Sequence, residues 1–311
     1  IETSRQSELQ LGSTIQQQLL FRGVPAGIDG VDAVVLAQPS KAINGDFYDI
    51  HAHSRQCVDI ALADVMGSGI PAALLGAAAK IELIQTVAEL TQGAATLPTP
   101  REIVKGYHKA MSPRLFAIER FITFCYTRID LVRGVASIVN CGHLPPLLYR
   151  ARTGKCEPVT CEQMPLGFAS LVEYEQVTIP IEPGDILLQC SDGVTETLSP
   201  EGEFYGFERL EQFLLAHHHL HSDGILDALN EELHQFCNGD NQHIDDRTCL
   251  IFRIGEINEQ SPNLLATTSE PDNLPEIRSF VESRILDLFG GEAVRDLLPE
   301  ILLATDEAIV N

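Results

Sequence analysis

The sequence predicts an α+β fold in which antiparallel β-sheets are covered by helices. Short apolar runs of strand type dominate from about residue 28 to 254, and longer helical stretches interrupt them without regular alternation of strand and helix. We expect strands at 31–38, 57–64, 121–130, 135–140, 175–179, 185–190 and 247–254. We expect helices near 71–91, 101–118, 205–216 and 224–237. The first of these begins at Pro71, a residue that suits the first turn of a helix.

The two ends of the chain differ from this central part. Residues 1–22 hold a polar helix with a narrow apolar stripe, which predicts a linker or coiled-coil helix and a homodimer formed through it. Residues 23–255 form the main domain, residues 256–273 are a polar linker, and residues 274–311 predict a short C-terminal helical segment. Because the chain begins at Ile1 without a Met or an export signal, we interpret it as a fragment of a longer protein.

Composition excludes several classes of protein. The formal net charge is −23, with 44 acidic and 21 basic residues, and such a field repels nucleic acid. Charged residues interrupt the apolar stretch at 70–90, so we expect no membrane segment. The eight Cys residues form no CxxC pair, which indicates small buried side chains in a reducing cytoplasm and not a zinc site or a disulfide framework.

Acidic residues recur where apolar strands end. They stand beside small residues in INGDFYD, LADVMGSG, CSDGVTE and HIDDRT, and they are Asp46, Asp64, Asp192, Asp245 and Asp246. An Asp beside Gly is often only a turn residue, so the joint occurrence carries the prediction. Carboxylates brought together would repel one another unless cations neutralised them. Oxygen-only ligation suits Mg²⁺ or Mn²⁺, and two such ions can activate water and polarise a phosphoryl oxygen.

Seven blocks follow one another between about residues 28 and 253: NGDFYD, ALADVMGSGIPAALL, FITFCYTRID, IVNCGHLPPLL, MPLG, GDILLQCSDGVTE and DDRTCLIF. Together they resemble the SpoIIE/RsbU-type branch of the PPM protein phosphatases. The resemblance implies a PPM-type β-sandwich flanked by helices, with two Mn²⁺ or Mg²⁺ ions at one end. It implies that Asp46 and Asp64 bridge the ions, that the Val65 carbonyl is a further ligand, and that Asp192 and Asp245 complete the catalytic set.

Four neighbouring residues are interpreted alongside this set. Asp246 matches a position beside the ligands and would support them. Relatives usually carry Gly-Gly before the first Asp, whereas this chain has Asn44 followed by Gly45, which we expect to tune the site without destroying it. Lys41 stands where relatives often carry Arg and would contact the substrate phosphate, unless it is only a solvated lysine at a strand end. His143 is expected to brace a loop, since the proposed ions prefer oxygen.

The C-terminal segment resembles the start of an anti-sigma-factor-like, histidine-kinase-type ATPase domain. The resemblance lies in EPDNLPEIRSFVESRIL and LLPEILLATDEAIVN. It implies that Glu307 activates water and that Asn311 binds the Mg²⁺ of the nucleotide cofactor. The Gly-rich lid motifs of such domains do not occur in this sequence, so we do not expect the segment to bind ATP well.

The function implied is hydrolysis of phosphoserine or phosphothreonine in a protein. The resemblance implies that the substrate is a phosphorylated STAS-domain anti-sigma factor antagonist in a bacterial partner-switching pathway. Two alternatives stay open at this stage. One is a phosphatase-fold binding module without turnover; the other is an anti-sigma kinase or sequestering regulator, with a sigma factor as partner of the longer parent chain.

Overall fold

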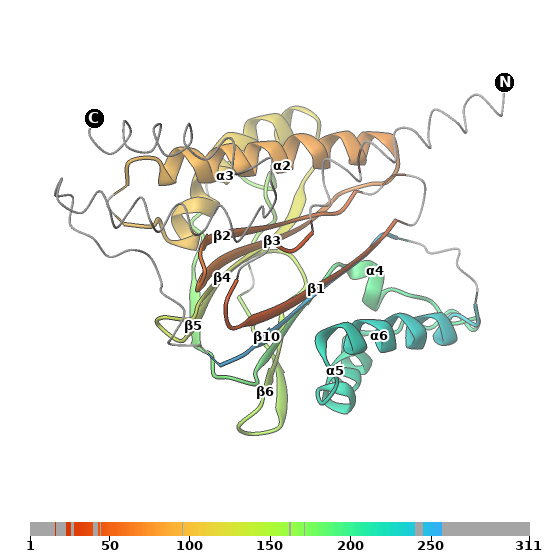
Figure 1. Ribbon diagram of the computed structural model, residues 1–311. Coiled ribbons are helices and arrows are strands. Elements are labelled where there is room, and N and C mark those ends of the chain that lie inside the picture. The colour runs from red at the N-terminus through yellow and green to blue at the C-terminus, as the bar shows by residue number, and fades with distance from the viewer. Residues whose placement is uncertain are drawn as a thin grey trace, which may run out of the picture. The chain divides into compact units, whose positions relative to one another are not determined.

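Two antiparallel sheets of five strands each pack face to face in the computed structural model (Figure 1). Sheet A has the order β1 (Val31–Gln38), β10 (Arg247–Ile254), β9 (Ile186–Cys190), β6 (Leu147–Arg150) and β7 (Lys155–Pro158). Sheet B has the order β2 (Phe47–Ser54), β3 (Cys57–Val65), β4 (Ile122–Asp130), β5 (Val135–Cys141) and β8 (Val177–Pro180).

The structure describes Gln16 and residues 23–25, 28–39, 43, 45–94, 96–161, 163–170, 172–239 and 245–256. The chain divides into two units, Ile1–Ile257 and Asn258–Asn311, and every described residue lies in the first. Apart from Gln16, the predicted N-terminal helix lies outside the described residues. So do the predicted linker beyond Glu256 and the C-terminal segment.

Helices cover the outer face of each sheet. Sheet B carries α2 (Ile70–Thr91) and α3 (Pro100–Ala117), whereas sheet A carries α5 (Phe207–His217) and α6 (Ser222–Phe236) (Figure 1). A single helical turn, α4 (Asp192–Thr195), follows β9. Three apolar cores result, one beneath each helix pair and one between the sheets. The predicted α+β sandwich of antiparallel sheets flanked by helices is therefore confirmed.

Strand β3 shows how the sequence builds two of these cores at once. Side chains alternate between the two faces of a strand. Ile60 and Leu62 pack into the core between the sheets, whereas Ala61 and Ala63 pack beneath α2 and α3. The strand is apolar on both faces for this reason. By the same alternation, Asp64 stands on the face shared with Leu62, at the end of the sandwich.

Helix α2 is long and apolar enough, by length and composition alone, to cross a membrane. In this structure eight of its residues are buried in the protein, among them Lys80. The Lys80 ammonium donates to the Tyr48 carbonyl at 2.7 Å and pairs with Asp49 at 3.2 Å. Gly76 lets the helix approach the chain before β2, because a Cβ there would lie 3.0 Å from the Gly45 oxygen. The helix is therefore packed as a core helix of the domain.

Candidate active site

Four chain segments carrying the predicted carboxylates meet at one end of the sandwich. Asp46 precedes β2 and Asp64 lies near the end of β3; these strands pair with Phe47 opposite Ala63. Asp192 follows β9 and Asp245 precedes β10; these strands pair with Cys190 opposite Cys249. In an antiparallel pair the start of one strand adjoins the end of the other. Each sheet therefore contributes two carboxylate-bearing segments to the same end.

Asp46 is the most buried of these carboxylates, with 2% of its surface exposed. Its Oδ2 accepts a hydrogen bond of 2.7 Å from the Thr248 hydroxyl, which lies on the other sheet. Burial, followed by the charge of Asp64, raises the pKa of Asp46 well above its ordinary value, although hydrogen bonds from Ser191 and Thr248 oppose the rise. A buried carboxylate next to another is stabilised in its charged form by a cation.

The pKa values of Asp64 and Asp192 are also raised by burial and by neighbouring negative charges. Burial and the charges of Asp192 and Asp245 raise the pKa of Asp64 to about 7. Burial and the charge of Glu196 raise the pKa of Asp192 to about 6. The sequence prediction missed Glu196, although it ends the CSDGVTE block, four residues after Asp192. A charge that acts on two of the predicted carboxylates makes Glu196 part of the same cluster.

Asp246 joins the two sheets at this end. Its Oδ2 accepts a hydrogen bond of 2.7 Å from the Gly45 amide, the residue before Asp46. Its carbonyl accepts one of 3.1 Å from the Ser191 hydroxyl, which in turn accepts one of 2.9 Å from the Thr248 amide. The Asp245 carboxylate accepts from the Asp246 amide at 2.8 Å. Asp246 thus fixes the backbone that carries Asp46.

Gly193 is required by a close approach between two of these segments. A Cβ at Gly193 would lie 2.0 Å from the Asp246 carbonyl oxygen, where real Cβ atoms are essentially never found. The backbone after Asp192 can therefore approach the segment before β10 only because residue 193 has no side chain.

Gly193→Ala is expected to push these two segments apart. We expect a loss of about 1–3 kcal/mol in the free energy of unfolding, the range for overpacking a buried position. Urea unfolding followed by circular dichroism measures it. The matched control is Gly23→Ala, because a Cβ at Gly23 would meet no atom within 4 Å apart from its chain neighbours. Gly202 is unsuitable as a control, since its positive φ of 84° would itself be strained by a side chain. Gly23→Ala should therefore change stability little, and equal effects at both positions would contradict the steric argument.

Two further residues of the sequence prediction, Val65 and His143, lie in the described part of the chain near these carboxylates. The Val65 carbonyl lies 3.5 Å from the Cβ position of Gly45, so it is turned towards the segment that carries Asp46. His143 is buried, and its Nδ1 lies 2.8 Å from the hydroxyl of Thr123, the residue that pairs with Asp64. Burial lowers the pKa of His143 to about 4. A neutral, buried His of this kind agrees with the bracing role expected from the sequence.

Four predicted features fall outside the described residues: Lys41, Asn44, Glu307 and Asn311. Their assigned roles as phosphate contact, backbone variant and ATPase residues stay predictions.

The described carboxylates fit a divalent cation in chemistry. They offer oxygen donors only, and their mutual repulsion favours a positive charge between them. Within the described ranges, however, no three His, Cys, Asp or Glu side chains are grouped closely enough to enclose one ion by themselves. An open arrangement suits ions that keep several water ligands, as Mg²⁺ does. The residues therefore fit hydrated hard cations better than a fully protein-ligated ion.

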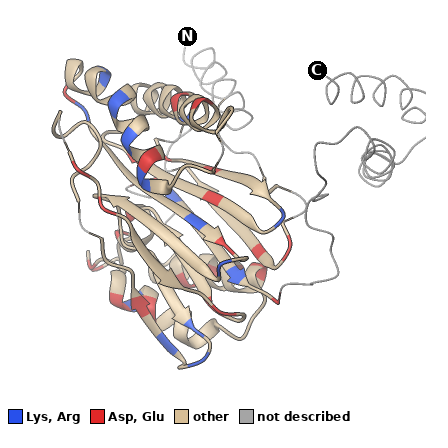
Figure 2. Ribbon diagram, turned by 90° about the vertical axis from the view of Figure 1, so that its left-hand side faces the viewer, with Lys and Arg blue, Asp and Glu red and all other residues tan. Residues whose placement is uncertain are grey.

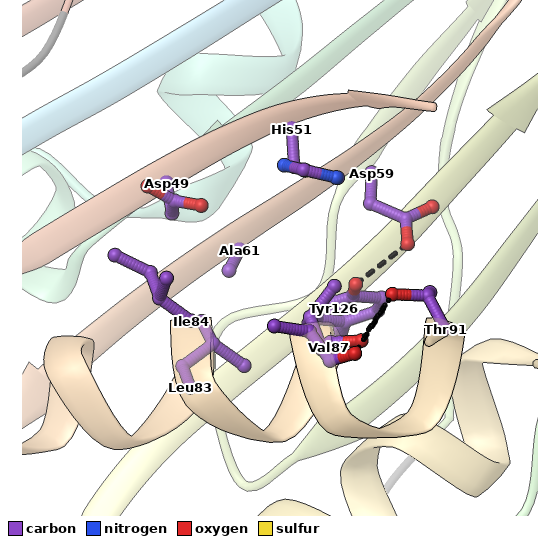
Figure 3. Close-up of a pocket in the computed structure, with 10 residues that line it drawn as sticks. Asp49, His51, Asp59, Ala61, Leu83, Ile84, Val87, Thr91 and Tyr126 are labelled. Atoms are coloured by element: carbon purple, nitrogen blue, oxygen red, sulfur yellow. Dashed lines mark hydrogen bonds between the residues drawn. The ribbon is translucent and has the colours of Figure 1, made fainter. Parts of the chain in front are cut away.

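A second polar cluster lies on the helix side of sheet B and includes none of these carboxylates. Asp59 accepts hydrogen bonds of 2.6 Å from both Arg128 and Tyr126, and its Oδ2 lies 2.7 Å from a ring nitrogen of His53. Figure 3 shows Asp59 and Tyr126 at the edge of a cavity of about 200 Å³, whose other wall is formed by Leu83, Val87 and their neighbours on α2. Because every charge here has a partner, the cluster is best explained as structural.

The fold belongs to a class with known structures, the PP2C-type phosphatase domains. The SiaA-PP2C domain of Pseudomonas aeruginosa aligns with 81% of this chain and 98% of its own, with a TM-score of 0.70 and 19% identity. The catalytic domain of the serine threonine protein phosphatase PstP, in complex with two manganese ions, aligns with 73% of this chain and 99% of its own, with a TM-score of 0.51 and 18% identity. At these identities the likeness establishes the fold.

The family follows from the sequence comparison. The model of stage II sporulation protein E (SpoIIE) matches residues 54–255, and the chain belongs to this family. Phosphoserine phosphatase RsbU of Bacillus subtilis (strain 168) is 27% identical over 206 residues, which cover 65% of this chain and 57% of RsbU. The chain spans about half the length of the curated relatives it matches.

Proposed function

We propose that this chain is a metal-dependent protein serine/threonine phosphatase. The observation that carries the proposal is the meeting of carboxylates from both sheets at one end of a PP2C-type sandwich, where burial and mutual repulsion raise the pKa values of Asp46, Asp64 and Asp192. Relatives named as phosphoserine phosphatases support it. A binding module without turnover would have no need to keep repelling carboxylates buried in this way.

The proposed cofactor is a pair of Mn²⁺ or Mg²⁺ ions. Asp46, Asp64, Asp192, Asp245 and the Val65 carbonyl would hold them. When bound, such ions lower the pKa of water and neutralise charge on phosphoryl oxygens.

The protein's own groups would orient this centre. Thr248 and Ser191 hold the Asp46 carboxylate, while Asp246 fixes the Gly45 backbone beside it. Neutral His143 supports Thr123 opposite Asp64. Lys41 is proposed to contact the phosphate as a positive point charge. In the proposed reaction a water molecule attacks phosphorus in line and the bond from phosphorus to the seryl or threonyl oxygen breaks. A proton from the water restores the hydroxyl, inorganic phosphate is released, and no covalent enzyme intermediate is required.

The proposed substrate is a phosphorylated STAS-domain protein of a partner-switching pathway in the cytoplasm. RsbU and a second relative from Bacillus subtilis (strain 168), RsbP, which is 26% identical over 250 residues, are both named phosphoserine phosphatases, and these names support a phosphoserine substrate. A structure described as the bacterial stressosome shares the fold, with a TM-score of 0.50. A homodimer through the N-terminal helix is proposed with it.

The test is phosphate release from a phosphoserine STAS-domain protein, with and without Mn²⁺. We expect release that requires the metal and that Asp192→Ala abolishes. No release by folded, metal-loaded protein would contradict the proposal and favour the binding-module alternative.

A further inference from the structure

Helix α3 is locally basic in a strongly acidic protein. Four of its residues are basic, and Glu102 is its one acidic residue, whereas the whole chain has a net charge of −23. Arg101, Lys105 and Lys109 recur every four residues and therefore share one side of the helix. In Figure 2 the basic residues of this helix appear as blue bands. A phosphoprotein approaching this chain is repelled by most of its surface, so a basic strip is where an anionic segment would be attracted.

A cavity of about 740 Å³ lies beside this strip. It opens between α3 and residues 170, 172 and 173, and its walls combine charged and apolar side chains: Lys105, Lys109, Pro113, Phe116, Val172 and Glu173. Phe116 is 44% exposed, although it is a large apolar residue. Exposed apolar surface framed by polar groups is typical of an interaction site. The cavity therefore offers contacts for apolar side chains and for acidic ones.

Hydrogen bonds between buried side chains hold the floor of the cavity in place. His108 is 5% exposed, and its Nδ1 lies 3.0 Å from both the Ser112 hydroxyl and the Tyr174 hydroxyl. The Thr99–Glu102 capping box fixes the start of the helix. A preorganised wall reduces the ordering that binding requires.

Charges at the rim are available to a partner. Lys109 forms no ion pair with any residue in the described ranges. Lys105 lies 3.8 Å from Glu173, and Arg101 lies 3.6 Å from it, but the Glu173 side chain is 78% exposed. Exposed ion pairs of this kind contribute little, so an acidic partner can replace Glu173.

The cavity is also connected to the carboxylate end of the sandwich. Leu166, just before the cavity segment, exchanges backbone hydrogen bonds of 2.9 and 3.0 Å with Ile122. Ile122 pairs in turn with Val65, the residue after Asp64. A protein segment in the cavity would therefore be held on the side of sheet B that leads to the proposed active site.

We propose that this cavity is a docking site for an acidic segment with apolar side chains in the phosphoprotein substrate. The inference rests on the proposed function for the identity of the partner. Lys105 and Lys109 would bind its carboxylates, while Phe116, Pro113 and Val172 would contact its apolar side chains.

Peptide binding tests the site without catalysis. The probe is a fluorescein-labelled peptide in which leucines alternate with pairs of glutamates, measured by fluorescence anisotropy against the full chain. We expect a Kd on the order of 10–100 µM, and a rise of at least about tenfold in Lys105→Glu/Lys109→Glu. Glu173→Gln should tighten binding, because it removes the competing carboxylate. Lys155→Glu, an exposed lysine on β7 of the other sheet, should leave it unchanged.

Three results would overturn the inference. They are equal binding of a peptide with glutamine in place of glutamate, equal loss in Lys155→Glu, and displacement of the peptide by inorganic phosphate at equal concentration, which would indicate a small-anion site. Hydrolysis of p-nitrophenyl phosphate, which needs no docking of a protein substrate, distinguishes failure of the docking site from failure of the proposed phosphatase activity. If the double variant keeps that activity while losing the peptide, the docking site stands; if the unaltered chain has no such activity but binds the peptide, the proposed phosphatase fails alone.

Discussion

Asp64→Asn is expected to lower phosphatase activity strongly while making the metal-free protein more stable. Burial, followed by the charges of Asp192, Asp245 and Asp246 around it, raises the pKa of Asp64 to about 7. Removing its charge takes away one proposed ligand and should lower kcat by roughly 10²–10³-fold, the range for one lost group that stabilises charge in the reaction. The same change removes repulsion between buried carboxylates, which should stabilise the metal-free fold by about 1 kcal/mol.

Two measurements check this pair of effects. Phosphate release with Mn²⁺ gives the activity, and urea unfolding in EDTA and in Mn²⁺ gives the stability. The unaltered chain should gain more stability from Mn²⁺ than the variant, since a ligand stabilises the state that binds it. Asp130→Asn is the matched control, because Asp130 ends β4 and pairs only with exposed Arg133 among the described residues. A variant that loses both activity and EDTA stability would show that Asp64 is needed for folding instead.

Much of the fold could be predicted because its strands have strong local signals. β1 and β10 coincide with the predicted runs, and α2 and α3 begin within a residue of the predicted starts. β2 was missed because polar residues such as His51 and His53 interrupt its apolar pattern. β6 and β7 have only four residues each and were missed, whereas β8, which is equally short, was predicted because Val177, Thr178 and Ile179 are β-branched.

The positions of the carboxylates were predictable, but their partners were not. Asp46, Asp64 and Asp192 stand at strand ends that are visible in the sequence. The bond from Thr248 to Asp46, in contrast, joins residues 202 apart in the chain. It depends on how two sheets pack, and no local pattern encodes that packing. The contact between Gly193 and Asp246 is also non-local, since it follows from the pairing of β9 with β10 within sheet A.

The Asp59–Arg128 pair was not predicted because it joins residues 69 apart in the chain through the pairing of β3 with β4, and it gives the largest expected effect on stability. Arg128 donates to both carboxylate oxygens of Asp59 at 2.6 Å and to the Pro98 carbonyl at 2.6 Å, which ties sheet B to the connection between α2 and α3. The Asp59 side chain is 1% exposed. Burial alone would raise the pKa of Asp59, but hydrogen bonds from Arg128 and His53 outweigh burial and lower it.

Arg128→Met is therefore expected to lower the free energy of unfolding by about 3–5 kcal/mol, because it leaves Asp59 charged, buried and without its main partner. Arg133→Met is the matched control. Arg133 is 81% exposed and lies 3.6 Å from Asp130, so its loss should change stability by less than about 1 kcal/mol. Chemical unfolding at pH 7 measures both.

A double variant distinguishes two causes of the lost stability: loss of the attraction between Arg128 and Asp59, and the unpaired charge that remains on buried Asp59. Asp59→Asn/Arg128→Met removes both charges, so it should recover part of the stability that Arg128→Met loses. The pH dependence has a definite sign. Because the folded pKa of Asp59 lies below its unfolded value, the pair stabilises the fold above the unfolded pKa, and this contribution disappears as the pH falls through the folded pKa. If the single and double variants unfold at the same urea concentration, the stranded Asp59 charge is not the cause of the loss, and the arginine acts through its bond to Pro98.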